Sequence, residues 1–428
     1  MLRTASRYTE NSRDKTKEGL SLDVIFSNRV RLSFDGNVML RLLFYAVWVS
    51  TLYVYVRGFI MRVPSLQNSV EVVVSLGYAA LVVMAWPVLA HKFSIGDYLF
   101  YLVSVAWLLA NYAFYPDNAE YLNDNVLICI FCVFPFYFIG RLIDIEKEYS
   151  MLLVLSLICV LWNMYYYFVF AQTYRNIKEV AQEDNMYAAY QILPHVVFVL
   201  WSALEKVRIW KLAAVLGGVL FLLSCGTRGP LVCLGFFGAV YFFFFMKFKG
   251  AMYVRTVIVI VGAVLAFNLR EIVLYLAEMF TGLHLSTRIL EKFIMGEMGN
   301  DSYRSVLRDK LYDVLNDGHF FGIGAFGTRN YDIIYPHYLP LDFACTYGYF
   351  IGYVLLVLLF ALIVYATVVA EKGREQVFLV YLFSISVVKL FLSNSFILEP
   401  YFYFLIGACV KVVMDSRQKK TMIECSHE

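Results

Sequence analysis

The sequence predicts an all-α polytopic membrane protein with about twelve transmembrane helices and one large loop outside the cytoplasm. Hydrophobic residues make up 61% of the 428 residues and charged residues only 16%, and the mean hydropathy is +0.66. Apolar runs long enough to cross a ~30 Å hydrocarbon core as helices follow one another along most of the chain. These runs are continuous, whereas the strands of a membrane β-barrel alternate polar and apolar residues.

The apolar runs divide the chain into tails, spans and one long polar segment. The expected spans, within several residues at each boundary, are 38–61, 70–90, 96–115, 125–143, 149–171, 187–204, 209–225, 229–246, 252–268, 346–370, 376–396 and 399–414. The resulting parts are an N-terminal tail (1–37), nine spans (38–268), a large loop (269–345), three spans (346–414) and a C-terminal tail (415–428). Short helices are expected within the large loop.

The distribution of positive charge predicts that both termini are cytoplasmic and that the large loop is not. Both tails are basic, and an even number of spans returns the chain to the same side. With this orientation most loop lysines and arginines face the cytoplasm; those outside the large loop that would face outward are Arg62, Arg175, Lys178 and Arg228. The polar N-terminal tail does not resemble a signal peptide and is expected to be disordered or to lie on the membrane surface. Residues 116–125 are expected to form an exported polar loop.

Composition and motifs argue against several classes of site. The net charge of +3 is small and spread over the loops, so nucleic-acid binding is not indicated. The chain has no P-loop, Rossmann fingerprint, HExxH motif or carboxylate cluster, and we therefore expect no metal or nucleotide cofactor. Cys129 and Cys132 form a CxxC in an apolar run, which is more typical of helix packing than of a metal site. Cys225 and Cys345 both fall near the outer face, and the sequence leaves open whether they pair.

The segment LLSCGTRGPLV joins two spans by a very short outer turn that contains Arg228. Glycines permit a close backbone approach there, and Pro230 suits the first turn of the next helix. An arginine fixed at a helix N-terminus is a good receptor for phosphate. The alternative is an interfacial arginine that snorkels to the membrane surface.

The segment GNDSYRSVLRDKLYDVLNDGHFFGIGAFG predicts a helix in the large loop that ends near Asn316, with Gly318 after it. Arg304 and Arg308 lie four residues apart and share a face, beside an apolar stripe formed by Tyr303, Val306, Leu307, Leu311, Val314 and Leu315. A basic face next to apolar surface suits a lipid-linked diphosphate at the bilayer edge. The alternative pairs these arginines with local carboxylates on a solvated surface.

The segment YPHYLPLDFACTYGYFIGYVL contains His337 just before the chain re-enters the membrane. Histidine titrates near neutral pH and can accept or donate a proton. Pro336 and Pro340 flank it in a stiff, non-helical stretch. His284 and His319 are less constrained candidates, and a structural role is the alternative for any loop histidine.

In order and content these three segments resemble the O-antigen polymerase and O-antigen ligase superfamily of bacterial surface-polysaccharide enzymes. The resemblance covers about residues 209–370 and depends on SCGTRGPL, the arginine-bearing helix with its GxG turn, and PHYLPLDFACTYGYFIG. It implies a metal-independent GT-C-like architecture in the bacterial inner membrane, with the large loop and the active site facing the periplasm. Tyr338 follows His337 where the family often has asparagine, which is a departure in local hydrogen bonding.

The resemblance implies transfer of an oligosaccharide from undecaprenyl diphosphate to a sugar hydroxyl. By this resemblance Arg228 and Arg304 bind the diphosphate, with Arg308 and Arg288 as supporting cations, and His337 lies close to the acceptor hydroxyl. A polymerase would extend another lipid-linked repeat and would have a chain-length regulator as a candidate partner. A ligase would load lipid A core instead, and these motifs do not separate the two; the loose match favours a polymerase.

A transporter or flippase for lipid-linked glycans is the alternative from a different class. Lys389 lies inside an apolar span, while Gln191, Pro194 and His195 interrupt another. Polar groups and broken helices within a membrane can mark a transport path. Interhelical hydrogen bonds or snorkelling account for the same residues, and no convincing inverted repeat is present.

Overall fold

The computed structural model describes residues 21–26, 30–49, 84, 92–165, 181–246, 256, 260, 268–282, 287–296 and 304–427. The chain divides into two compact units, Met1–Leu99 and Phe100–Glu428. In the first, strands β1 (Ser21–Phe26) and β2 (Val30–Asp35) form an antiparallel hairpin that leads into helix α1 (Gly36–Trp48). The expected disordered tail is therefore corrected over β1 and β2, because six cross-strand pairs, from Ser21 with Asp35 to Phe26 with Val30, order this segment locally.

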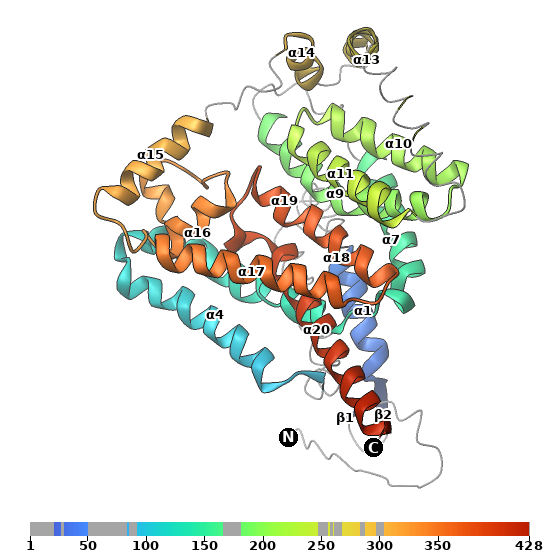
Figure 1. Ribbon diagram of the computed structural model, residues 1–428, viewed down its shortest axis with the longest axis vertical. Coiled ribbons are helices and arrows are strands. Elements are labelled where there is room, and N and C mark those ends of the chain that lie inside the picture. The colour runs from blue at the N-terminus through green and yellow to red at the C-terminus, as the bar shows by residue number, and fades with distance from the viewer. Residues whose placement is uncertain are drawn as a thin grey trace. The chain divides into compact units, whose positions relative to one another are not determined.

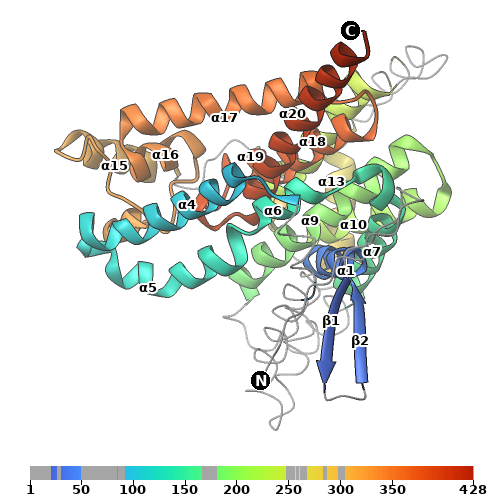
Figure 2. The ribbon, with the colours of Figure 1, turned by 90° about the horizontal axis from the view of Figure 1, so that it is seen from below.

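The described part of the second unit is helical, and α4 enters it from the first (Figures 1 and 2). Its α-helices are α4 (Ile95–Phe114), α5 (Ala119–Ile128), α6 (Phe136–Leu142), α7 (Ile145–Tyr165), α9 (Ala181–Glu205), α10 (Ile209–Ser224), α11 (Arg228–Val240), α13 (Leu269–Gly282), α14 (Arg288–Ile294), α15 (Arg304–Asn316), α16 (Leu339–Tyr347), α17 (Tyr349–Val369), α18 (Arg374–Ile385), α19 (Val387–Leu390) and α20 (Pro400–His427). The 3₁₀-helices are η1 (Pro116–Asn118), η6 (Gly327–Tyr331) and η7 (Phe396–Leu398). The π-helices are η2 (Cys129–Val133) and η4 (Tyr241–Phe245). Helix α9 packs against α7, α10 and α11, and α20 packs against α6, α17 and α18.

Five of the described helices are long and apolar enough to cross a membrane, which confirms the class of helical membrane protein. They are Ile95–Phe114, Pro116–Leu142, Met186–Glu205, Arg228–Phe245 and Tyr349–Val369, and they correspond to expected spans. The expected spans 38–61, 70–90, 149–171 and 252–268 lie wholly or partly outside the described residues. The total of about twelve spans therefore stays a prediction.

The segment expected as a polar outer loop at 116–125 is helical. Pro116 starts η1 and Glu120 lies in the first turn of α5. Proline suits the first turn of a helix, and an acidic side chain there interacts favourably with the helix dipole. The polar residues thus form the beginning of the Pro116–Leu142 helix instead of a separate loop.

Two expectations about the spans are wrong: α9 is not interrupted at Pro194, and the span expected at 376–396 is not continuous. Helix α9 continues through Pro194 to Glu205, and the Tyr381 hydroxyl donates a hydrogen bond to the Pro194 carbonyl at 3.1 Å, as neighbouring helices often support proline in a span. The expected span 376–396 is broken instead. It ends as α19 at Leu390 and gives way to turns rich in serine and asparagine, whose side chains compete with helical hydrogen bonds.

Arg374 brings together three helix ends that the sequence placed on one side of the membrane. Its guanidinium forms ion pairs with Glu205 at 2.9 Å and with Glu146 at 3.6 Å, and it lies 4.0 Å above the Tyr149 ring. The end of α9 and the starts of α7 and α18 therefore meet at one end of the bundle.

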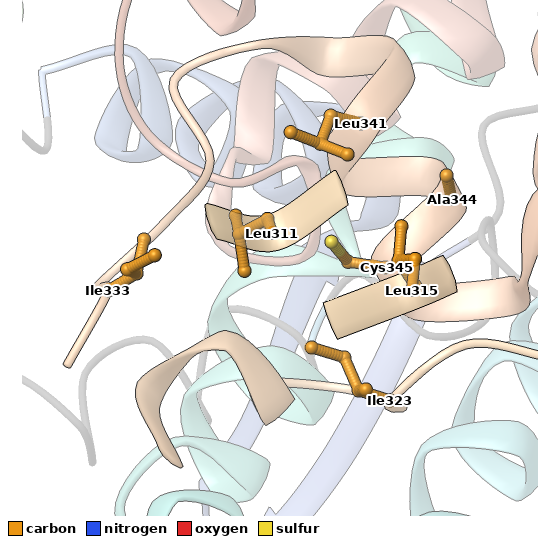
Figure 3. Packing of buried hydrophobic residues seen from close by; sticks show 7 residues of the cluster. All are labelled: Leu311, Leu315, Ile323, Ile333, Leu341, Ala344 and Cys345. Atoms are coloured by element: carbon orange, nitrogen blue, oxygen red, sulfur yellow. The ribbon is translucent and has the colours of Figure 1, made fainter. Parts of the chain in front are cut away.

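At the beginning of α17, a small hydrophobic cluster fixes α15 against α16 (Figure 3). Leu311 and Leu315 of α15 are fully buried against side chains from α16 and two turns, and the cluster consists of Leu311, Leu315, Ile323, Ile333, Leu341, Ala344 and Cys345. Leu307 and Val314 pack against its edge. This confirms most of the expected apolar stripe; Val306 is instead 46% exposed, and Tyr303 lies outside the described residues.

The glycine-rich turn 322–327 is held by two buried asparagines that the sequence analysis did not single out. Asn118 donates from Nδ2 to the carbonyls of Ile323 and Ala325 at 2.8 and 3.0 Å. The Asn111 Oδ1 accepts a hydrogen bond from the Ala325 amide at 2.7 Å. Gly324 has φ +77°, and a Cβ on it would lie 2.4 Å from the Tyr115 ring, so glycine is required here. The turn is consequently rigidly attached to the α4–α5 corner.

We expect Leu311→Ala to lower the free energy of unfolding by about 2–5 kcal/mol, because a fully buried leucine leaves a cavity when truncated. Val306→Ala on the same helix is the matched control and should change stability by less than about 0.5 kcal/mol. Thermal unfolding of the purified protein in detergent measures both. Equal effects of the two substitutions would show that α15 is not docked through Leu311.

Candidate functional site

Arg228 begins helix α11 directly after the tight turn that follows α10. A Cβ on Gly229 would lie 1.9 Å from the Tyr190 hydroxyl oxygen, so only glycine allows α11 to approach α9 this closely. Pro230 lies in the first turn of α11, as the sequence predicts. The turn therefore holds the backbone of Arg228 next to Tyr190.

Arg304 and Arg308 lie one turn apart on α15 and both act on the same histidine. The charges of both guanidinium groups reach His337, and the Arg308 Cζ lies 5.9 Å above the Tyr338 ring. Among the described residues Arg304 forms no ion pair with a carboxylate. Arg304 and Arg308 therefore both act on the segment that precedes α16.

His337 is held in an uncommon backbone conformation and by a specific hydrogen bond. Its φ is 55°, in the left-handed region. Its Nδ1 lies 3.3 Å from the Leu392 carbonyl oxygen, and the Tyr335 ring packs 4.4 Å from the imidazole centroid. Because a carbonyl only accepts, the proton of a neutral imidazole is on Nδ1, and the lone pair is on Nε2.

The surroundings of His337 favour the neutral imidazole. Burial, together with the positive charge of Arg304 and, more weakly, of Arg308, lowers the pKa of His337 from 6.5 to about 4. The sequence-based expectation of titration near neutral pH is therefore wrong for the protein without an anion bound. At neutral pH His337 is ready to accept a proton, but its low pKa makes it a weak base.

The remaining predicted cations lie in the same region. The guanidinium of Arg228 is within electrostatic range of both Arg304 and Arg288, and Arg288 begins α14. Electrostatic interactions thus link the five predicted site residues pairwise, with Arg228 linked to Arg288 and Arg304, and His337 to Arg304 and Arg308. These five residues are here called the arginine–histidine cluster: Arg228, Arg288, Arg304, Arg308 and His337. Four guanidinium groups linked in this way, two of which act on His337, form an environment suited to a polyvalent anion.

Several polar residues next to this cluster were not found from sequence. Tyr190 interacts with Arg304, Tyr335 and Ser393, and the Ser393 Oγ lies 3.4 Å from the Tyr335 hydroxyl. Tyr190 is an ordinary aromatic residue in an apolar span, so only its contacts reveal it. The run 393–395 could have been identified from the sequence, because serine and asparagine interrupt an apolar span there.

Lys389 is neither snorkelling nor alone, because Glu399 forms an ion pair with it. Glu399 is fully buried, and its Oε2 also accepts a hydrogen bond from Asn394 at 2.9 Å. The Lys389 ammonium lies 5.1 Å from the centre of the Tyr190 ring, a cation–π contact. This ion pair connects α19 to the start of α20. Leu392, whose carbonyl contacts His337, lies between the two in sequence.

No interaction joins His319 to the arginine–histidine cluster among the described residues. His319 is exposed after the end of α15 and lies 3.4 Å from the Tyr331 hydroxyl; His284 lies outside the described residues. Cys225 and Cys345 are both buried and form no disulfide with each other. Cys129 is buried and Cys132 exposed, and they form no disulfide either. The residues that the structure describes contain no group of three or more histidine, cysteine or carboxylate side chains arranged to hold a metal ion.

We expect the His337 imidazole to remain neutral until the pH falls to about 4. Inorganic pyrophosphate should raise this pKa, because it neutralises the arginines that oppose protonation. Histidine NMR with selective ¹³C labelling measures the titration, and His337→Gln assigns the resonance. A midpoint near 6.5 that pyrophosphate does not move would contradict the proximity of Arg304 and Arg308.

We expect Glu399→Ala to destabilise the protein by about 3–5 kcal/mol, because it leaves the Lys389 charge in apolar surroundings. The double substitution Lys389→Met with Glu399→Leu removes both charges and should be less destabilising than Glu399→Ala alone. Thermal unfolding in one detergent compares the variants. Additive losses in the double variant would show that the two side chains do not interact.

Searches against protein-family models, curated proteins and solved structures found no match. The chemistry of the arginine–histidine cluster is therefore the basis for the functional argument that follows.

Proposed function

We propose that this protein is a metal-independent membrane glycosyltransferase, a polymerase of the O-antigen or surface-polysaccharide type. Its donor would be an undecaprenyl-diphosphate-linked oligosaccharide and its acceptor a sugar hydroxyl of another lipid-linked repeat. The observation that supports this most is that Arg304 and Arg308 both act on a neutral histidine, while Arg304 also lies within electrostatic range of Arg228. The proposal includes twelve spans, a GT-C-like fold, cytoplasmic termini and a site that faces the periplasm of the bacterial inner membrane.

In the proposed reaction the acceptor oxygen attacks the anomeric carbon and the bond from that carbon to the diphosphate oxygen breaks. Arg228 and Arg304 would bind the diphosphate, with Arg288 and Arg308 contributing further positive charge. Preorganised donors of this kind stabilise the charge that develops on a leaving group. The hydroxyl proton would pass to Nε2 of His337, the nitrogen that carries the lone pair.

The low pKa of His337 links the two substrates in this proposal. Without donor, the arginines keep the imidazole a weak base. A bound diphosphate carries negative charge that offsets theirs, so the pKa of His337 would rise and the base would strengthen. Deprotonation of the acceptor would then be favoured only when the donor is in place, which limits side reactions of the activated hydroxyl.

We expect Arg304→Ala and Arg228→Ala to lower the rate of polymer formation by about 10² to 10³-fold each, and His337→Ala by about 10² to 10⁴-fold. The assay is a gel of products made by the purified protein from a native undecaprenyl-diphosphate oligosaccharide. Arg417→Ala, an exposed position on α20, is the control and should retain activity. Full polymer synthesis by His337→Ala would eliminate the base assignment.

The acceptor distinguishes a polymerase from a ligase. A ladder of products from the lipid-linked donor alone would support a polymerase. A strict requirement for lipid A core would identify a ligase, which uses the same donor chemistry at the arginine–histidine cluster.

A transporter of lipid-linked glycans is the second candidate, and one observation favours it. The α18–α19 helix is broken, and the buried Lys389–Glu399 pair lies at the break. Charged groups at helix breaks can form part of a transport path. Proton-coupled movement of a lipid-linked glycan by the purified protein in vesicles, with no covalent product, would support this candidate over the enzyme.

A further inference from the structure

Two adjacent phenylalanines in the turn after α15 expose their rings. Phe320 is 55% exposed and Phe321 is 78% exposed, and their ring centres lie 5.6 Å apart in an edge-to-face arrangement. Asp317 and His319, which precede the pair, are exposed and polar, whereas the turn 322–327 that follows it is buried. Large apolar side chains that stay exposed as a group indicate a contact with something outside the chain.

The backbone of this pair is attached to the beginning of α17. The Phe320 carbonyl accepts a hydrogen bond from the Tyr349 amide at 3.2 Å, and the two rings lie 6.0 Å apart. A Cβ on Gly348 would lie 2.6 Å from the Phe321 carbonyl carbon, so only glycine allows the two segments to come this close. The Tyr349 hydroxyl also donates a hydrogen bond to the Asn316 Oδ1 at 3.2 Å. The pair therefore stays at the level of the first turn of α17.

The ends of three helices that are long and apolar enough to cross a membrane fix the height of the pair. The helix Tyr349–Val369 begins there, and between the helices Ile95–Phe114 and Pro116–Leu142 lies Tyr115. The Tyr115 hydroxyl donates a hydrogen bond to the Phe321 carbonyl at 3.3 Å. Figure 2 shows the α4–α5 corner at the same end of the bundle as α15 and the start of α17. Because the ends of a span lie at the surfaces of the bilayer, the pair lies at the boundary between membrane and water.

Further aromatic side chains are exposed at the ends of these helices. Phe114, the last residue of α4, is 77% exposed, and Phe350, in the first turn of α17, is 74% exposed. Each is next in sequence to a tyrosine that contacts the pair, Tyr115 or Tyr349. Aromatic side chains commonly occupy the layer where spans meet the lipid headgroups. The surroundings of the pair are therefore those of an interfacial layer.

We propose that Phe320 and Phe321 insert into the lipid bilayer and anchor the end of α15 to the membrane surface. The partner is the boundary between lipid headgroups and acyl chains, because the pair is attached to the first turn of the span Tyr349–Val369. The polar residues before the pair stay in water, and the hydrogen bond from Tyr349 to Asn316 holds the last turn of α15 at this boundary. The large loop thus has a membrane contact of its own, and this inference does not depend on glycosyl transfer.

The test measures the depth of one side chain in the bilayer. An environment-sensitive fluorescent amino acid replaces Phe321 by stop-codon suppression, and the full-length protein is placed in phosphatidylcholine nanodiscs, which leave both faces of the bilayer open to solutes. The two quenchers are lipids brominated on the acyl chain and iodide in the water. We expect the lipids to quench this label and iodide not to, with shallow and deep bromines placing it about 5–10 Å inside the headgroup boundary. The same label at Asp313, an exposed position of α15, is the matched control and should be quenched by iodide alone.

Thermal unfolding in detergent verifies that each labelled protein is folded. Iodide quenching at position 321 equal to that at position 313 would overturn the proposal, because the pair would then lie in water. Protection from both quenchers would also overturn it, because a second copy or another protein surface would then cover the pair.

A second measurement uses the unlabelled protein in the same nanodiscs. A lipid with a photoreactive group on its acyl chain should form adducts at Phe320 or Phe321, which mass spectrometry locates. Adducts on α17 with none on the pair would show that the bilayer does not reach it. Neither measurement requires polymer formation, so the anchor and the proposed function can fail separately.

Discussion

The packing of α15 on α16 is the constraint on which the rest of the site depends. Leu311 and Leu315 are fully buried between α16 and the turns that carry Ile323 and Ile333. This burial fixes the rotation of α15 about its axis, and the position of Arg304 and Arg308 follows from that rotation. The same cluster includes Cys345 of α16, so one small core positions both the basic helix and the segment that contains His337. A loop helix docked in this way can hold two charges with little loss of side-chain entropy at binding.

The electrostatic balance of the cluster is unusual because the charges are nearly all of one sign. Arg228 lies within range of Arg288 and Arg304, and His337 lies within range of Arg304 and Arg308. Like charges interact unfavourably, and in the proposed function a bound diphosphate would offset them. Burial, together with the charges of Arg304 and Arg308, keeps His337 neutral, which leaves a lone pair on the imidazole near neutral pH. In the proposed reaction, diphosphate binding and proton acceptance would therefore be coupled through these arginines.

The broken span that contains α18 and α19 supports His337. Because the helix ends after α19, the Leu392 carbonyl is available to the His337 Nδ1. In an intact helix this carbonyl would accept a hydrogen bond from within the helix. The Lys389–Glu399 pair closes the break by tying α19 to α20. A buried ion pair contributes little net stability but makes one arrangement of the chain strongly preferred over others. In this protein that preference fixes the backbone that selects the tautomer of the histidine.

The sequence by itself determined the membrane class, the approximate position of several spans and a helix that ends at Asn316, and it suggested the five residues of the arginine–histidine cluster as candidates. These features follow from hydrophobicity, helical periodicity and the known chemistry of arginine and histidine, all of which are local properties of the chain. Only the tertiary structure decided the pKa of His337, the ion pair of Lys389, the continuity of α9 through Pro194 and the attachment of Phe320 to the start of α17. Each of these depends on which groups from distant segments lie together, and burial and Coulomb interactions are set by those distances and not by residue type.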